Sequence, residues 1–247
     1  MCLLVVQKPN AKMSNKQIEN AWIRNSDGSG YSFCKDNKII TKKYMDLNDF
    51  KSNLNNDWNS NKDKVFLIHF RYATHGITDV SNVHPFKVNN GLVFGHNGVI
   101  NCVDDDNQLS DTQVFNNTIL KNLKNGFLKN DAIKKLISES IGNSKLAFLD
   151  NQNRYTIINS YLGNWNQNKS IWFSNDSHKK SKVVVYGGNY NGWHKYNHIQ
   201  NDFKFDEENT KSKRCDWCLS DSVDYGVNQN GTVVCDTCDD DFKSYNI

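Results

Sequence analysis

The chain has 247 residues, enough for one sizeable domain or for one domain with a small appendage. Lysine and arginine total 30 against 27 aspartate and glutamate, and the net charge of +3 gives no reason to expect nucleic-acid or membrane binding. No apolar run approaches the roughly 20 residues that span a bilayer, and the N-terminus lacks the features of a signal peptide. Four of the 7 cysteines form a metal-type pattern rather than a disulfide framework, so we expect a reducing, cytoplasmic compartment.

Cys2 follows the initiator methionine and comes directly before an apolar run that predicts a buried strand. Removal of Met1 would give Cys2 a free α-amine with a pKa of about 7.7–8.0. That amine could take the proton of the neighbouring thiol and later return it, so that one residue supplies nucleophile and base. A lone cysteine is more often a small buried hydrophobic residue. The catalytic interpretation therefore depends on an oxyanion hole and substrate-binding groups elsewhere in the chain.

The first part of the chain alternates strands with helices. Apolar spacing predicts a strand at 3–6, a helix at 14–24, strands at 31–34 and 38–44, and a short helix at 46–54. The clearest buried strand is 65–71, which ends in Arg71. A guanidinium in that position requires an anion, either a structural salt-bridge partner or a bound ligand.

The segment 91–100 has the pattern of a strand, a turn and a second strand, with Asn97-Gly98 as the turn. An Asn-Gly pair is typical of a β-hairpin, and this is the favoured interpretation of the pair by itself. The alternative is that the Asn97 side-chain amide and the Gly98 backbone N–H donate hydrogen bonds to one developing negative charge.

Ser110 and Gln113 form a capping box, which predicts a helix start and places Asp111 in the first helical turn. A carboxylate fixed there could receive a substrate ammonium, or it could simply favour the helix N-terminus. A second helix is expected at 131–141, followed by strands at 145–149, 155–159, 170–173 and 182–186. This succession predicts an α+β fold with antiparallel sheets.

The C-terminal part begins with residues 201–214, which are charged and poor in apolar side chains and which we expect to form a linker. Two Cys-x-x-Cys pairs follow, formed by Cys215, Cys218, Cys235 and Cys238. Paired thiolates with this spacing predict a zinc ribbon over 215–247, and the Zn²⁺ would be structural because four cysteines fill its coordination sphere. Acidic residues outnumber basic ones in this segment, which argues against contact with phosphate.

Several motifs occur in a characteristic order, namely Cys2, Arg24-x-x-Asp27-x-x-Gly30, His69–Gly76, Asn82–Pro85, His96–Gly98 and Ser110–Thr112. Together they resemble the glutaminase domains of class II glutamine amidotransferases. The resemblance covers residues 2–200 and implies the four-layer αββα fold of N-terminal-nucleophile hydrolases. It leaves 201–214 as the linker and 215–247 as the zinc ribbon.

The resemblance also implies a role for individual side chains. Cys2 would attack the side-chain amide of L-glutamine, release ammonia and form a thioester that water hydrolyses to glutamate. Asn97 and Gly98 would form the oxyanion hole. The residues implied to bind glutamine are Arg71 at its α-carboxylate, Asp111 at its α-ammonium, and Tyr72, Thr74 and His75 along the pocket.

Two features depart from the family pattern. Asn25 follows Arg24 where a glycine is common, and a zinc ribbon stands where a synthase domain is usual. We therefore expect a glutaminase subunit that supplies ammonia to a separate acceptor protein. Two other interpretations stay open, an N-terminal-nucleophile amidohydrolase that acts on another amide, and an inactive relative that serves as a zinc-ribbon interaction module. The first of these should not need both Arg71 and Asp111.

Overall fold

The computed structural model describes residues 2–73, 78–103 and 109–180, together with the backbone of four short strands between residues 213 and 235. The chain divides into two compact units, residues 1–180 and 181–247. The strand expected at 182–186 lies outside the described residues. Among the described residues, no helix combines the length and the apolar character needed to cross a membrane.

The first unit contains the helices and the longer strands. The helices are α1 (Asn15–Arg24), α2 (Leu47–Ser60), α3 (Asp111–Thr118) and α4 (Asp131–Ser140). The strands are β1 (Leu3–Gln7), β2 (Ser29–Lys35), β3 (Lys38–Tyr44), β4 (Phe66–Phe70), β5 (Phe86–Asn89), β6 (Leu92–Asn97), β7 (Lys145–Asp150), β8 (Tyr155–Ile158), β9 (Asn164–Trp165) and β10 (Ile171–Phe173).

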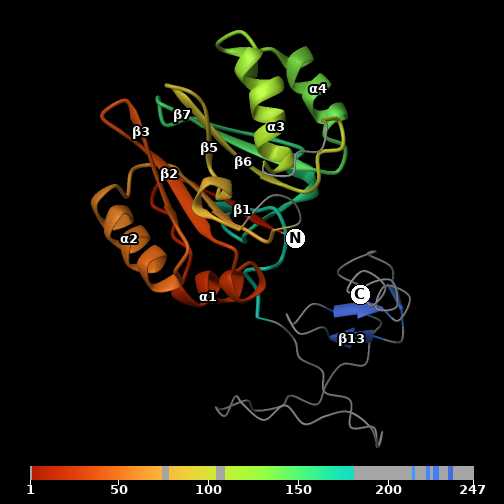
Figure 1. Ribbon diagram of the computed structural model, residues 1–247. Coiled ribbons are helices and arrows are strands. Elements are labelled where there is room, and N and C mark those ends of the chain that lie inside the picture. Colours follow the sequence, from red (N-terminus) through yellow and green to blue (C-terminus); the bar gives the residue numbers. More distant parts are fainter. Residues whose placement is uncertain are drawn as a thin grey trace, which may run out of the picture. The chain divides into compact units, whose positions relative to one another are not determined.

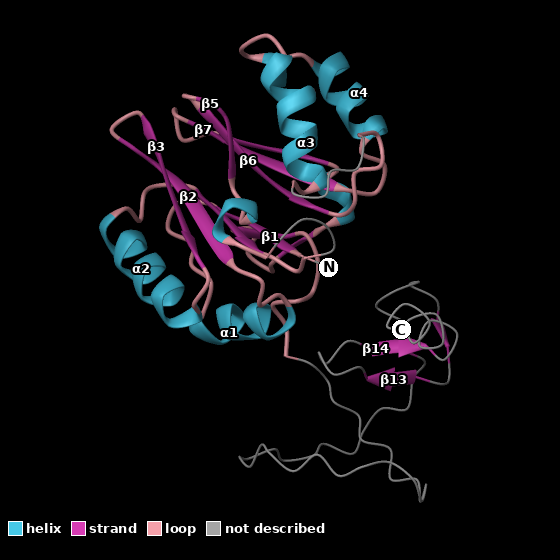
Figure 2. Ribbon diagram, viewed as in Figure 1, coloured by secondary structure: helices cyan, strands magenta, loops and turns pink. Residues whose placement is uncertain are grey.

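Two antiparallel sheets stack face to face, and a pair of helices covers the outer face of each (Figures 1 and 2). Sheet A has the strand order β3-β2-β4-β1-β10-β9, and sheet B has the order β5-β6-β7-β8. Helices α1 and α2 lie against sheet A, whereas α3 and α4 lie against sheet B (Figure 1). The expected α+β class with antiparallel sheets is thereby confirmed, and the layers follow the order α, β, β, α.

Three hydrophobic clusters fill the three spaces between these layers. Along β1, Leu3 and Val5 pack toward α1 and α2, while Leu4 and Val6 pack toward sheet B. Strand residues alternate between faces, so a strand that is buried on both sides has no polar alternation. This explains why the start of the chain reads as one continuous apolar run.

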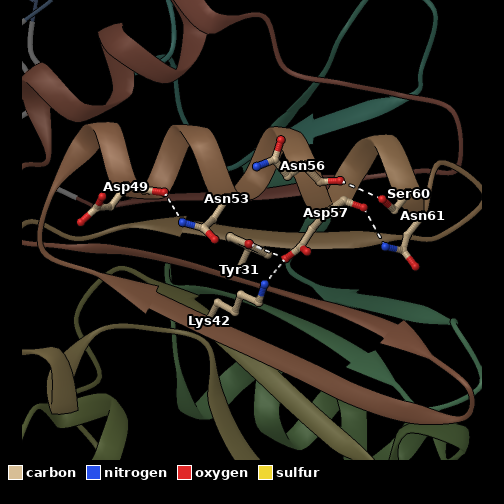
Figure 3. Close-up of polar contacts among 8 residues, drawn as sticks. All are labelled: Tyr31, Lys42, Asp49, Asn53, Asn56, Asp57, Ser60 and Asn61. Carbon is tan, nitrogen blue, oxygen red and sulfur yellow. Dashed lines mark hydrogen bonds and ion pairs between the residues drawn. The ribbon is translucent and has the colours of Figure 1, made fainter.

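Helix α2 is longer than the sequence predicts: it runs from Leu47 to Ser60, whereas the expected helix ends at residue 54. Its second half is rich in Asn and Asp, and such residues hide the apolar periodicity on which the prediction rested. The Asp57 carboxylate accepts hydrogen bonds from the Tyr31 hydroxyl at 2.6 Å and from Lys42 Nζ at 2.8 Å (Figure 3). These bonds attach the polar half of the helix to β2 and β3.

The hairpin interpretation of Asn97-Gly98 is wrong. Strand β6 ends at Asn97, and no further strand follows it before α3 in the described residues. The hairpin of this region lies one strand earlier, where Asn89 pairs with Leu92 and the Gly91 N–H donates to Asn89 Oδ1 at 2.9 Å. Gly98 itself has φ +140°, a value that L-residues rarely adopt.

The second unit contains two short antiparallel pairs, β11 (Lys213–Arg214) with β12 (Asp221–Ser222), and β13 (Tyr225–Val227) with β14 (Val233–Cys235). Strand β11 ends directly before Cys215, and β14 ends at Cys235. The other three expected zinc ligands are Cys215, Cys218 and Cys238, and they lie outside the described residues. The zinc ribbon and its Zn²⁺ therefore stay a prediction.

Candidate active site

Cys2 lies directly before β1, which is an inner strand of sheet A. The register pairs Leu3 with Phe70, so Cys2 meets the chain as it leaves β4. The Tyr72 N–H donates to Cys2 Sγ over an N–S distance of 3.3 Å, and the thiol donates to the Tyr72 carbonyl at 3.3 Å. Tyr72, which was expected to bind substrate, thus contacts the thiol through its backbone.

The environment of Cys2 keeps its thiol protonated. Burial raises the pKa of Cys2 above its ordinary value, and the nearby Asp111 adds to this effect. The Tyr72 N–H and the positive charge of Arg71 act in the opposite direction but do not outweigh burial. Since the thiolate is the nucleophile, the thiol needs a base to become reactive at neutral pH.

Asn97 reaches Cys2 from the other sheet. Two residues earlier on β6, Gly95 packs against Leu4, and a Cβ at that position would lie 2.6 Å from Leu4 Cδ1. The missing side chain therefore lets the two sheets approach closely at this point. As a result, Asn97 Nδ2 donates a hydrogen bond to the Cys2 carbonyl oxygen at 2.5 Å.

Gly98 is fixed by its surroundings as well as by its backbone angle. A Cβ at this position would lie 2.2 Å from Ser144 Oγ. That hydroxyl is itself held in place, because it donates to the Val99 carbonyl at 2.8 Å. A side chain at position 98 would therefore require both an unfavourable φ and a displacement of Ser144.

Arg71 is buried at the end of β4, with 3% of its surface exposed. The backbone N–H of Arg71 donates to the Gly28 carbonyl at 2.8 Å, and the backbone carbonyl of Arg71 accepts from the Asp27 N–H at 3.0 Å. The Asp27 carboxylate also accepts from the Ala73 N–H at 2.7 Å. The motif that contains Asp27 thus holds the chain on both sides of Arg71. Burial lowers the pKa of Arg71, and the charges of Cys2, Asp27 and Asp79 partly oppose this shift.

Asp111 begins α3 and is held by backbone groups. Its Oδ2 accepts from the Ile100 N–H at 2.7 Å, and its Oδ1 accepts from the Thr112 N–H at 2.7 Å. The capping box predicted at Ser110 is present, with Gln113 N–H donating to Ser110 Oγ at 3.3 Å. Oδ1 also accepts from the Thr112 hydroxyl at 3.2 Å. A carboxylate oxygen has two lone pairs, so Oδ2 is the oxygen that can still accept from a ligand.

The structure therefore brings Cys2, Arg71, Asn97 and Asp111 together from four elements of two sheets and one helix. Gly98 follows Asn97 directly, and Thr74 and His75 lie outside the described residues. One further residue at Cys2 was not expected from the sequence. Asn175, which follows β10, donates from Nδ2 to the Cys2 carbonyl oxygen at 2.7 Å. No sequence signal distinguishes it, because asparagine is abundant throughout the chain.

Three buried histidines lie beside this group, between the two sheets. The rings of His69 and His84 are 4.0 Å apart between centroids, and His84 Nδ1 accepts from the His96 N–H at 3.3 Å. Burial lowers the pKa of His69 to about 3 and that of His96 to about 4. His96 Nδ1 lies 2.7 Å from Thr112 Oγ1, so a neutral histidine connects this cluster to the start of α3. Among the described residues, no group of His, Cys, Asp or Glu side chains is placed to hold a metal ion.

No protein-family model matches the chain. Over 106 residues it is 32% identical to glutamine–fructose-6-phosphate aminotransferase (isomerizing) of Bradyrhizobium diazoefficiens, a match that covers 38% of this chain and 17% of that protein. The chain thus spans less than a fifth of that relative's length. A structure of glutamine phosphoribosylpyrophosphate amidotransferase from B. subtilis, complexed with ADP and GMP, aligns with a TM-score of 0.45 and 19% identity. That alignment covers 70% of this chain and 41% of the other.

Proposed function

We propose that the chain is a glutaminase subunit, which hydrolyses the side-chain amide of L-glutamine through a Cys2 thioester and supplies ammonia to a separate acceptor enzyme. The observation that carries this proposal is that a cationic, an anionic and an amide side chain are grouped around one thiol. Arg71 suits an α-carboxylate, Asp111 suits an α-ammonium, and Asn97 suits a carbonyl oxygen that becomes negative. A free amino acid with a side-chain amide has all three groups. The name of the Bradyrhizobium relative also includes glutamine.

The proposed reaction begins after removal of Met1. The free α-amine of Cys2 takes the thiol proton, and the thiolate attacks the amide carbon of glutamine. The oxygen of the tetrahedral intermediate accepts two hydrogen bonds, one from the second Nδ2 hydrogen of Asn97 and one from the backbone N–H of Gly98. The protonated amine gives its proton to the departing nitrogen, and ammonia leaves as the thioester forms.

Hydrolysis of the thioester uses the same groups in the reverse order. The α-amine takes a proton from water, and the resulting hydroxide attacks the thioester carbon. The carbon–sulfur bond then breaks, glutamate leaves, and the thiolate takes the proton back from the amine. The raised pKa of the thiol acts in both directions: it makes the first proton transfer to the amine less favourable, and it favours return of the proton to the sulfur at the end of the cycle.

The C-terminal residues take a different part in the proposal. Four cysteines would bind a structural Zn²⁺ there, supported by the paired spacing and by strands that end directly before Cys215 and at Cys235. A closed site of this kind leaves no position for substrate. The unit is therefore assigned to docking of the acceptor protein.

The direct test is release of glutamate and ammonia from L-glutamine by the purified protein. Cys2→Ala should abolish release without unfolding the chain, whereas Cys102→Ala, which changes an exposed thiol, should not. A glutamine analogue with a diazoketone in place of the amide should label Cys2, as seen by peptide mass spectrometry. Hydrolysis of other amides but not of glutamine would indicate an amidohydrolase. A wild-type protein that neither releases ammonia nor labels Cys2 would overturn the enzymatic assignment.

A further inference from the structure

We infer that Asn175 is a positioning residue for the nucleophile, acting on Cys2 through the Cys2 carbonyl oxygen. Asn175 Nδ2 lies 2.7 Å from that oxygen, and Asn97 Nδ2 lies 2.5 Å from it. A carbonyl oxygen has two lone pairs, so these two amides together satisfy it. One amide comes from sheet B and the other from the segment that follows β10 of sheet A. The backbone of Cys2 is therefore held from both layers at once.

The orientation of the Asn175 amide is fixed by its own neighbours. Its Oδ1 accepts a hydrogen bond from the Ser177 N–H at 3.0 Å. Because a backbone N–H can only donate, the oxygen must face Ser177 and the nitrogen must face Cys2. Asn175 therefore has to be a donor to the Cys2 carbonyl, which no acceptor at this position could replace.

The turn that carries Asn175 is itself anchored. His178 Nδ1 lies 3.2 Å from the Asn175 carbonyl, and the His178 ring stacks on Phe173 with centroids 3.6 Å apart. Just before the turn, Ser174 exchanges two hydrogen bonds of 2.9 Å with Leu4. The segment is thus tied to β1 on one side and packed against β10 on the other. A donor held in this way can set the position of Cys2 rather than follow it.

The hydrogen bond from Asn175 matters because Cys2 is not paired with either of the two strands that flank β1. The register of β1 runs from Leu3 with β4 and from Val5 with β10, so Cys2 lies beyond the last ladder pair on either side. Side-chain amides therefore do what a neighbouring strand does elsewhere in the sheet. Fixing the Cys2 carbonyl also fixes the direction of its α-amine and thiol, and it keeps the second Asn97 hydrogen available for substrate.

The inference rests on the proposed function for its kinetic consequence. Asn175→Ala should lower kcat for glutamine hydrolysis by about 10- to 100-fold, because misplacing a reacting group by about 1 Å can cost about 10²-fold. KM should change by less than about threefold, because Arg71 and Asp111 are not altered. Alkylation of Cys2 by iodoacetamide without glutamine should become faster, because the loosened backbone exposes the thiol.

Asn175→Asp tests whether donation itself is the property that matters. An ionised carboxylate cannot donate to a carbonyl, whereas a protonated one can. At this half-buried position, a hydrogen bond that only the protonated form can donate to the carbonyl oxygen raises the pKa of the carboxyl group. The kcat of this variant, divided by the wild-type value at the same pH, should therefore rise as the pH falls from 8 to 5.5. The same ratio for Asn175→Ala should stay flat. A residue that only stabilises the fold would not produce this difference.

The matched control is Asn61→Ala. Asn61 is buried, whereas Asn175 is half-buried, and the Asn61 Nδ2 likewise donates to a backbone carbonyl, that of Asp57 at 2.7 Å on α2 (Figure 3). The kcat of Asn61→Ala and the rate at which its Cys2 is alkylated should match those of the wild type, compared at the same fraction of folded protein. Unchanged kcat and unchanged alkylation in Asn175→Ala would overturn the inference, as would equal losses in Asn61→Ala. If the wild type does not hydrolyse glutamine, the proposed function fails, and the alkylation experiment still decides whether Asn175 positions Cys2.

Discussion

His69 on β4 and His96 on β6 join the two sheets through a hydrogen bond of 2.9 Å, from His69 Nε2 to the His96 carbonyl oxygen. Because a carbonyl only accepts, Nε2 must carry the hydrogen. His69 Nδ1 is then a buried acceptor, and it has no hydrogen-bond partner among the described residues. Protonation of His69 would bury a charged N–H at Nδ1, for which the described residues offer no acceptor. The contact between the sheets beside Asn97 therefore depends on a neutral histidine.

The first prediction is that the protein loses stability as the pH falls below about 6.5, the ordinary histidine pKa. The native pKa values of His69 and His96 are lowered to about 3 and about 4, and that of His84 is well below its ordinary value. In this window the unfolded chain binds more protons than the native one, so the free energy of unfolding decreases as the pH decreases. Each such histidine contributes a slope of up to about 1.4 kcal/mol per pH unit.

Urea unfolding at several values between pH 7.5 and 5 measures this slope. The charged groups that interact with the cluster are Lys43, Arg71, Asp111 and Lys145. Burial lowers the pKa of Lys43 to about 8, so this lysine begins to titrate at the upper edge of the window and the histidines account for the slope below pH 7. His84→Gln should remove part of the dependence. A stability that does not change between pH 7 and 5 would show that the rings accept protons in the native state.

The sequence predicted individual elements of this fold better than their arrangement. The strand at Cys2, the strand that ends in Arg71 and the capping box at Ser110 all depend on local patterns, and all were found. The contact between Asn97 and Cys2 depends on how two sheets stack, and Asn175 reaches Cys2 only because β10 pairs with β1. Neither relation leaves a periodic or compositional trace. The same limit explains why the hairpin prediction for Asn97-Gly98 is wrong, since the local pattern of that pair is that of a hairpin.

The second prediction concerns Gly98. Gly98→Ala should destabilise the fold by about 1–3 kcal/mol and lower kcat, because it combines an unfavourable φ with a clash against Ser144. Gly126→Ala is the matched control, because Gly126 has φ +82° and, among the described residues other than its two chain neighbours, no atom lies within 4 Å of the added Cβ. Urea denaturation of both variants separates strain from clash. Equal destabilisation of the two would show that Ser144 does not constrain position 98.

The third prediction separates binding from chemistry. Asp111→Asn should chiefly raise KM for glutamine, because it removes the charge that faces the α-ammonium. Asn97→Ala should chiefly lower kcat, by roughly 10²–10³-fold, because its amide acts on charge that exists only in the transition state. Asp131→Asn provides the control, as Asp131 begins α4 just as Asp111 begins α3. An effect of Asn97→Ala on KM alone would contradict its place in the oxyanion hole.

The fourth prediction tests the identity of the base. A form of the protein that retains Met1 should fold normally and bind glutamine, but it should not release ammonia, because the Cys2 nitrogen is then part of a peptide bond. Burial already raises the pKa of the thiol, so little thiolate forms without a base. Intact mass spectrometry gives the fraction of chains that retain Met1. A normal turnover rate in a sample that fully retains Met1 would mean that another group takes the thiol proton.

The last prediction concerns the C-terminal unit. The purified chain should contain a single Zn²⁺, as measured by elemental mass spectrometry, and replacement of Cys218 and Cys238 by serine should remove it. The residues grouped around Cys2 all lie before residue 181 in the sequence, within the first unit. Deletion of residues 211–247 should therefore leave the basal release of ammonia from glutamine largely unchanged. It should also abolish binding of the proposed acceptor enzyme, which is to be identified by copurification with the full chain. The zinc-free double serine variant should behave like the deletion, because the short segment lacks the apolar residues for a core of its own. Loss of the basal activity in either variant would place the ribbon within the fold of the catalytic unit and would refute a role limited to docking.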